Sequence, residues 1–331
     1  MRFRGYAASV AEANVVVDGS PNDGTVLTLT HWPGFPQPEG FRFDLSAEMA
    51  LHYLDDPIDH PPAGIVTNNH FDQDGLVGIH ALVNPEVSLD HRELLIDVAS
   101  AGDFATFRDR RAARASMVID AYADIERSPI ASALVGSYDE QCVVLYEETI
   151  PLLVSMATDA DRFRDLWADE DAELTASESA LSEGIVMIEE VPDIDLAIVT
   201  IPDNEASRGG HRFAGMSFNS VHPMALHNAT GCFRLLVVHG RCYRFVDRYE
   251  TWVQYRSRAP RPRVDMHPLA ESLTARERGS ARWSADAPGS LTPMLRVTDE
   301  SSIEPEILRE MVVAHLRNSA PAWNPYSDGD T

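Results

Sequence analysis

The sequence predicts an α/β fold, with a mostly parallel sheet in an N-terminal domain and a smaller α+β domain after it. Over residues 14–126, short apolar strands alternate with amphipathic helices, which is the pattern of a parallel sheet. After residue 184 the pattern turns mainly to short strands. We therefore expect two domains, residues 1–183 and residues 184–331.

Local patterns predict the elements of the N-terminal domain in order. Apolar or alternating residues predict three strands, at 14–18, 25–31 and 64–67. Apolar residues at helical spacing predict helices at 44–54, 75–83, 90–102, 109–126 and 140–171. We expect the second of these to pack closely through its glycines. The acidic stretch 168–183 is predicted to be a linker or an exposed helix.

The C-terminal domain is predicted to be richer in strands. We expect two strands within 184–201 and further strands at 213–221, 232–239, 241–248 and 250–256. A helix is predicted near 304–317. The residues after it, which include two prolines and a glycine, are expected to be loose.

The composition excludes several classes of function. The chain of 331 residues has a formal net charge of −25, and all 27 basic residues are arginine. Enzymes that depend on a Schiff-base lysine or a P-loop lysine are therefore excluded. No apolar run is long enough for a membrane span, and three scattered cysteines match no disulfide framework or zinc motif. We expect a cytoplasmic protein, and nucleic-acid binding by so acidic a surface is not favoured.

Polar residues follow each of the three predicted N-terminal strands. Asp18 ends the first strand, His31 ends the second, and the segment 69–75 follows the third. In parallel α/β sheets, ligands bind at the carboxyl ends of the strands. We therefore expect these polar residues to form one site.

The segment 67–75 carries the strongest motif, because a histidine and two carboxylates alternate in it. Carboxylates with an imidazole suit Mn²⁺ or Mg²⁺, and Fe²⁺ is an alternative. The other interpretation is an Asp-rich turn that caps the helix at 75. A dinuclear site needs ligands from several elements, and Asp103 at a helix end adds one. The expected metal ligands are Asp18, His31, His70, Asp72, Asp74 and Asp103.

The string His-Phe-Asp-Gln-Asp-Gly at 70–75 resembles the first motif of the DHH phosphoesterase superfamily. Residues 207–215 are similar to the glycine-rich histidine signature of that family's C-terminal substrate domain. The resemblance implies two Mn²⁺ ions and hydrolysis of a phosphoester or phosphoanhydride bond. The family's Asp-His-His triplet is absent, and its nearest echo, Thr30-His31-Trp32, precedes the first motif. The resemblance therefore implies a rearranged sheet.

The resemblance also implies roles for individual residues. His70, His31 and Asp74 are expected to be catalytic. Asn69, Arg208, Gly210 and His211 are expected to bind a small anionic or phosphorylated substrate. The alternative for the glycine-rich string is a plain turn between two strands.

A local group of basic residues stands out in the C-terminal half, where eight arginines lie between residues 234 and 263. They could bind an anion or single-stranded nucleic acid, or pair with the acidic N-terminal domain. The sequence thus predicts a divalent-metal-dependent hydrolase, and it allows a homodimer without determining the oligomeric state. Two alternatives stay open: a metal enzyme with other chemistry, such as amide hydrolysis or non-haem iron redox, and a non-catalytic nucleotide- or anion-binding protein.

Overall fold

The computed structural model describes residues 1–203 and 221–326. It is a mixed α/β structure that contains one parallel sheet and one mixed sheet. Contacts between Cα atoms divide the chain into two compact units, Met1–Ala172 and Glu173–Thr331. None of the described helices combines the length and the hydropathy needed to cross a membrane.

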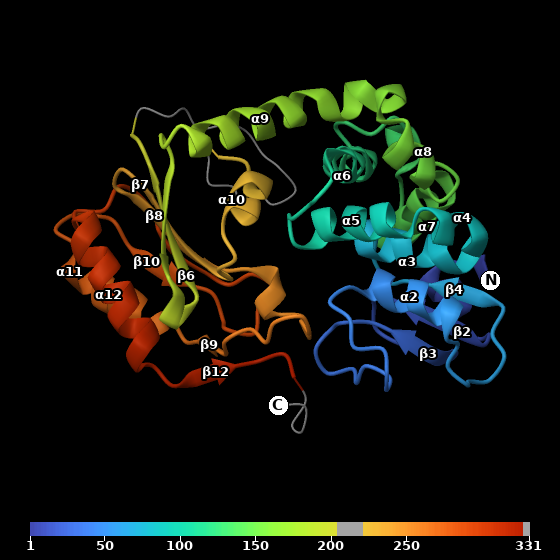
Figure 1. Ribbon diagram of the computed structural model, residues 1–331. Helices are drawn as coiled ribbons and strands as arrows, with labels where there is room; N and C mark the ends of the chain where they lie inside the picture. Colours follow the sequence, from blue (N-terminus) through green and yellow to red (C-terminus); the bar gives the residue numbers. More distant parts are fainter. Residues whose placement is uncertain (204–220, 327–331) are drawn as a thin grey trace. The chain divides into compact units, whose positions relative to one another are not determined.

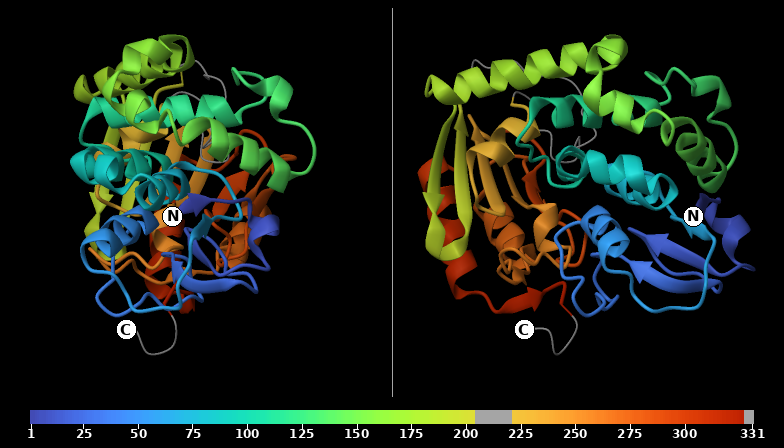
Figure 2. Two further views of the ribbon diagram at one scale, coloured as in Figure 1. Left: turned by 90° about the vertical axis from the view of Figure 1, so that its right-hand side faces the viewer. Right: turned by 45° about the vertical axis from the view of Figure 1, so that its right-hand side comes forward.

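The first unit is built on a sheet of four parallel strands in the order β1-β4-β2-β3 (Figures 1 and 2). The strands are β1 (Arg2–Phe3), β2 (Asn14–Val17), β3 (Thr25–Leu29) and β4 (Ile65–Thr67). Strand β2 lies between β3 and β4, and all four of its residues are buried. The ends of β2, β3 and β4 therefore meet at one edge of the sheet, with β2 in the middle.

Helices of the first unit pack on this sheet and on one another. They are α1 (Tyr6–Ser9), α2 (Ser46–Asp55), α3 (Gln73–Val83), α4 (Pro85–Asp90), α5 (Arg92–Asp103), α6 (Arg110–Ala123), α7 (Tyr138–Thr149) and α8 (Leu153–Thr158), with short 3₁₀ turns η1 (Ala131–Ala133) and η2 (Ala160–Phe163). Helices α2 and α3 contact the strands, and α5 and α6 follow outward from α3 (Figure 1). The close packing expected at a glycine is confirmed, because a Cβ on Gly78 would lie 2.4 Å from Val17 Cγ1.

The second unit is built on a six-stranded mixed sheet in the order β10-β11-β8-β7-β6-β5. Its strands are β5 (Met187–Val191), β6 (Leu196–Ile201), β7 (Arg234–His239), β8 (Cys242–Asp247), β10 (Trp283–Ala285) and β11 (Met294–Val297). Strands β6 and β7 are parallel, and the other pairs are antiparallel. Strand β12 (Pro321–Trp323) pairs with β9 (Arg263–Val264) in a separate two-stranded ladder.

Alternate residues of the central strands point to opposite faces of this sheet, and each face packs in its own hydrophobic core. On one face, Leu196 and Ile198 pack with residues of α11 (His267–Arg276) and α12 (Pro305–Asn318). On the other face, Ala197 and Val199 pack with α10 (Pro223–Ala229) and with the end of α9 (Arg164–Ser182). Turns η3 (Pro192–Ile194) and η4 (Tyr249–Thr251) complete the described elements of this unit.

Several predicted elements differ from the structure. The predicted strand at 250–256 is wrong, because the chain there forms η4 and turns held by Thr251, whose hydroxyl donates to the Arg248 carbonyl. The predicted helical stretch 140–171 is broken into α7, α8, η2 and the start of α9. The acidic stretch 168–183 belongs almost entirely to α9. The strand predicted at 213–221 lies, except for Val221, outside the described residues.

Candidate metal centre

Six side chains from five segments of the first unit converge at the edge where β2, β3 and β4 end. Asp18 follows β2, His31 follows β3, and His70 and Asp72 lie in the loop after β4. Asp74 lies in the first turn of α3, and Asp103 is the last residue of α5. The structure therefore brings together all six residues that the sequence predicts as metal ligands.

Asp18 stands in the middle of this group because β2 is the middle strand of the three. Its Oδ1 lies 3.4 Å from His31 Nε2, and its Oδ2 lies 3.2 Å from His70 Nε2. We call Asp18, His31, Asp74 and Asp103 the inner group, and Asp18, His70 and Asp72 the outer group. Asp18 belongs to both groups because each of its carboxylate oxygens faces a different imidazole.

The inner group is buried, and one carboxylate oxygen of each of its three aspartates lies near His31 Nε2. His31 Nε2 lies 3.5 Å from Asp103 Oδ2 and 3.8 Å from Asp74 Oδ2, and the His31 side chain is 0% exposed. These separations exceed those of ordinary N–H···O bonds. Ligand atoms held about 2.1 Å from a common cation would lie roughly 3.0–3.6 Å apart. The inner spacing is therefore close to that of ligands around an ion.

The tautomer of His31 is fixed by a backbone carbonyl. His31 Nδ1 lies 2.6 Å from the carbonyl oxygen of Asp44, and a carbonyl can only accept, so Nδ1 carries the proton. The lone pair of Nε2 then points toward the carboxylates in the neutral ring. This is the arrangement by which proteins orient metal-binding histidines.

The outer group is tighter and partly open to solvent. His70 Nε2 lies 2.8 Å from Asp72 Oδ2, and 20% of the His70 side chain is exposed. Trp32 lies beside the His70 ring, with ring centroids 5.2 Å apart. Burial opposes the charged form of His70, but Asp72 and Asp18 outweigh it and raise the pKa of His70 to about 10. Without other cations, His70 thus serves as the positive partner of two acids.

Asp72 confirms the helix-cap interpretation and also belongs to the cluster of histidines and carboxylates. Its Oδ1 accepts a hydrogen bond of 2.9 Å from Gly75 N, which makes Asp72 the N-cap of α3. Its Oδ2 faces His70. One oxygen thus caps the helix while the other belongs to the outer group.

Helix α2 holds the inner group from the side. The backbone N–H groups of Ser46 and Ala47 donate to the two oxygens of Asp74, each at 2.8 Å. The Ser46 hydroxyl donates to Asp18 Oδ1 at 2.9 Å and accepts from His31 N at 3.2 Å. The positive end of the α2 dipole therefore points into the acidic cluster. Ser46, which contacts three of the six residues, was not among the predicted site residues.

Burial is electrostatically costly for Asp74. The pKa of Asp74 is raised well above its usual value. The largest cause is desolvation by burial, and the negative charges of Asp18 and Asp72 add to it. The structure pairs neither Asp18 nor Asp74 with an arginine among the described residues. A divalent cation would supply the missing positive charge.

Backbone strain is concentrated around the cluster. Of the three described non-glycine residues with positive φ, Asp18 has φ +52° and Ala105, two residues after Asp103, has φ +53°. Such backbone is unfavourable for residues with a Cβ and is typical of functional sites. Gly19 has no room for a side chain, since a Cβ there would lie 2.3 Å from Asn69 Oδ1. The strand ends are thus packed tightly against one another.

The predicted substrate-binding residues are only partly described. Asn69 lies beside the cluster, and its Oδ1 accepts from Ser20 N at 3.1 Å. Arg208, Gly210 and His211 lie outside the described residues.

A family model for proteins of unknown function, DUF6687, matches residues 1–327. The chain belongs to this family. No curated protein and no solved structure matches it. The description of the DUF6687 family names no reaction. The similarity to DHH phosphoesterases stays a prediction.

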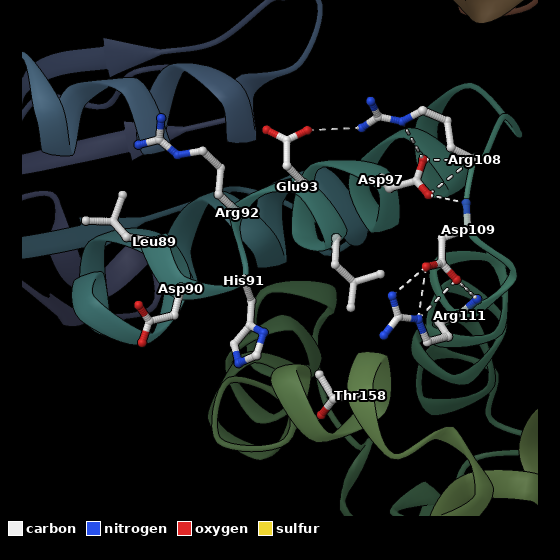
Figure 3. Close-up of a pocket in the computed structure, with 11 residues that line it drawn as sticks. Leu89, Asp90, His91, Arg92, Glu93, Asp97, Arg108, Asp109, Arg111 and Thr158 are labelled. Atoms are coloured by element: carbon white, nitrogen blue, oxygen red, sulfur yellow. Dashed lines mark hydrogen bonds and ion pairs between the residues drawn. The ribbon is translucent and has the colours of Figure 1, made fainter.

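The first unit of this DUF6687 member also contains an open pocket of about 770 Å³ that shares no residue with the acidic cluster (Figure 3). It is lined by α4, the start of α5, the start of α6, and Thr158. Its arginines have acidic partners: Arg111 pairs with Asp109 at 2.6 Å, and Arg108 lies 3.6 Å from Asp97. We assign it no ligand.

The arginine-rich segment of the DUF6687 chain is largely paired within its own unit. Arg234 lies 3.2 Å from Asp247, Arg258 lies 2.9 Å from Asp195, and Arg248 pairs with Glu250. The alternative that these arginines pair with the N-terminal domain stays a prediction. Arg263 is fully buried and donates to Thr251 and to three backbone carbonyls. These side chains stabilise the fold of the second unit.

Proposed function

We propose that the chain is a divalent-metal-dependent hydrolase that cleaves a phosphoester or phosphoanhydride bond with a metal-activated water. The observation that carries this proposal is the position of Asp18 between His31 and His70, with one carboxylate oxygen facing each imidazole. That arrangement supports two adjacent cation sites with a shared ligand. Two cations in such a site lower the pKa of a bound water and neutralise charge on a phosphoryl group.

The residues divide into two roles by their burial. The inner group would hold one ion, since its side chains are buried and His31 is oriented by the Asp44 carbonyl. The outer group would hold the second ion, and there His70 and Asp72 meet solvent. We propose Mn²⁺, because each half offers one imidazole and two or more carboxylates.

The chain's own residues set where the substrate meets the site. His31 has no exposed surface, so we assign it to holding the ion and not to proton transfer. His70 is the accessible imidazole, and its Nε2, which faces Asp18 and Asp72, would bind the outer ion. Trp32 and Asn69 lie beside His70 and the Asp18 loop, where they would contact a substrate that reaches the outer group.

The test is a hydrolysis assay of the purified protein with added Mn²⁺. Bis-p-nitrophenyl phosphate and a cyclic dinucleotide offer phosphoester bonds, and pyrophosphate offers a phosphoanhydride bond. We expect Mn²⁺-dependent turnover of at least one, and its loss in Asp72→Ala and Asp74→Ala. Asp90→Ala, which removes an exposed carboxylate on α4, is the matched control and should keep the activity.

The outcomes separate the proposal from the alternatives. Bound metal without turnover of any phosphoester would favour another metal-dependent reaction, and bound iron would favour redox chemistry. Turnover that survives both aspartate substitutions would contradict the assignment of the site.

A further inference from the structure

Helix α7 reaches the outer group through a tyrosine that the sequence does not link to the motif. Tyr146 is 0% exposed, and its hydroxyl donates to the carbonyl oxygen of His70 at 2.9 Å. The ring packs between Phe3 and Phe71, with centroid distances of 4.8 and 5.1 Å. The position of the hydroxyl is therefore fixed by packing on both sides of the ring.

The two histidines of the cluster are oriented in different ways. His31 is oriented through its ring, because Nδ1 is bonded to the Asp44 carbonyl. For His70, Nδ1 is buried and has no hydrogen-bond partner in the described part of the chain. Metal-binding histidines usually donate their second ring nitrogen to a carbonyl or carboxylate. Apart from the Nε2 contacts with Asp18 and Asp72, the orientation of the His70 ring therefore depends on its backbone and on ring contacts.

The backbone around His70 has three polar anchors, and the one from Tyr146 is the shortest. His70 N donates to Asn68 Oδ1 at 3.2 Å, and Phe71 N donates to the Tyr138 hydroxyl at 3.4 Å. The Tyr146 hydroxyl also lies close to the start of α3, since a Cβ on Gly75 would lie 2.7 Å from it. One hydroxyl thus bonds to the peptide of His70 and lies beside the helix turn that follows Asp72.

We propose that Tyr146 is a positioning residue for the outer metal site, which it serves by fixing the His70 peptide so that the imidazole faces Asp18 and Asp72. This inference rests on the proposed two-ion site. It adds that α7, a helix that supplies none of the six ligands, determines the affinity of the outer group. The inner group, which α2 and the Asp44 carbonyl hold, does not depend on it.

The test is a calorimetric Mn²⁺ titration of the full chain and of Tyr146→Phe, which keeps the ring and removes only the hydroxyl. We expect two equivalents in the wild type. In Tyr146→Phe the first equivalent should bind as before, and the second should bind about tenfold more weakly, as for other substitutions beside metal ligands. Tyr122→Phe, which removes the hydroxyl of another buried tyrosine, on α6, is the matched control and should change neither.

The Mn²⁺ electron paramagnetic resonance spectrum of the second equivalent separates positioning from a general effect on folding. A positioning role predicts a changed spectrum in Tyr146→Phe. Unchanged affinity and spectrum for the second equivalent would overturn the inference while leaving the proposed function intact. A wild type that binds no Mn²⁺ would overturn both. Equal weakening of both equivalents would also overturn the inference, because it would indicate a loss of overall stability.

Discussion

Two regions of the chain bury many charged side chains, and they balance the charge differently. In the first unit, Asp18, Asp74 and Asp103 lie around His31, and no arginine pairs with Asp18 or Asp74 among the described residues. In the second unit, buried Arg234 and Arg248 each meet a buried carboxylate. Burying a charge without a partner of opposite sign is costly. The second cluster is balanced by its own arginines, and we propose that divalent cations balance the first.

The largest effect is expected from Asp18, the residue shared by both halves of the acidic cluster. Asp18→Asn removes the charge and leaves nearly the same shape. We expect loss of both bound ions and a fall in hydrolysis of more than about 100-fold, beyond the usual effect of a residue next to a ligand. Metal analysis and the Mn²⁺-dependent assay measure this. Asp23→Asn, an exposed carboxylate five residues away, should behave as wild type; two equivalents of metal in Asp18→Asn would refute the bridging role.

Breaking the arginine network should affect stability without affecting metal. Arg248→Met leaves Glu250 buried without its partner, and such a change costs about 3–5 kcal/mol. Denaturant unfolding measures the loss, and metal content should stay at the wild-type value. Arg309→Met, which breaks the exposed pair with Glu189, should change stability little. If Arg248→Met lost metal instead, the two clusters would not be independent.

Chelation should act on the first unit alone. An ion present at 100 times its dissociation constant stabilises the folded state by about 2.7 kcal/mol. Removing it with EDTA should speed amide hydrogen exchange in the loops after β2, β3 and β4 and at the start of α2. Strands β7 and β8 serve as the internal control and should exchange at the same rate. Equal acceleration in both units would argue against a localised ion.

A buried histidine away from the carboxylates offers the smallest test. His80 lies near the end of α3 with Nδ1 2.7 Å from Ser88 Oγ, and burial, together with His91, lowers the pKa of His80 to about 4. Since the unfolded chain binds this proton below about pH 6.5, stability is lost as the pH falls from 6.5 toward 4. The loss should be about 2 kcal/mol at pH 5.

Unfolding measured between pH 7.5 and 5 in the wild type and in His80→Gln checks this. The variant should lack about 2 kcal/mol of the pH dependence. An identical slope in both proteins would show that His80 does not titrate as expected. The comparison with His70 is direct, because acidic neighbours raise the pKa of one histidine and burial without them lowers that of the other.

The acidic cluster could be predicted from the sequence because a simple rule places it. Parallel strands end at one edge, so Asp18, His31 and the loop after β4 had to meet once the strands were recognised. The order of the strands could not be derived, and that order is what puts Asp18 between the two histidines. Two strands as short as β1 and β9 also carry too little pattern to be recognised.

The residues that hold the ligands in place, Ser46 and Tyr146, could not be predicted from the sequence for a different reason. Ser46 and Tyr146 lie 28 and 76 residues from the ligands that they hold, Asp18 and His70. Neither has a local signature, since one begins an ordinary helix and the other is a buried helical tyrosine. The strand expected at 250–256 failed because Arg248, Glu250 and Thr251 bond locally and turn the chain.

Metal stoichiometry shows whether the acidic cluster binds two divalent cations. The purified full chain, loaded with Mn²⁺ and freed of excess by gel filtration, is analysed for metal by mass spectrometry. We expect two equivalents of Mn²⁺ per chain. A chain that retains no divalent metal, at a protein concentration where it is folded, would contradict this expectation.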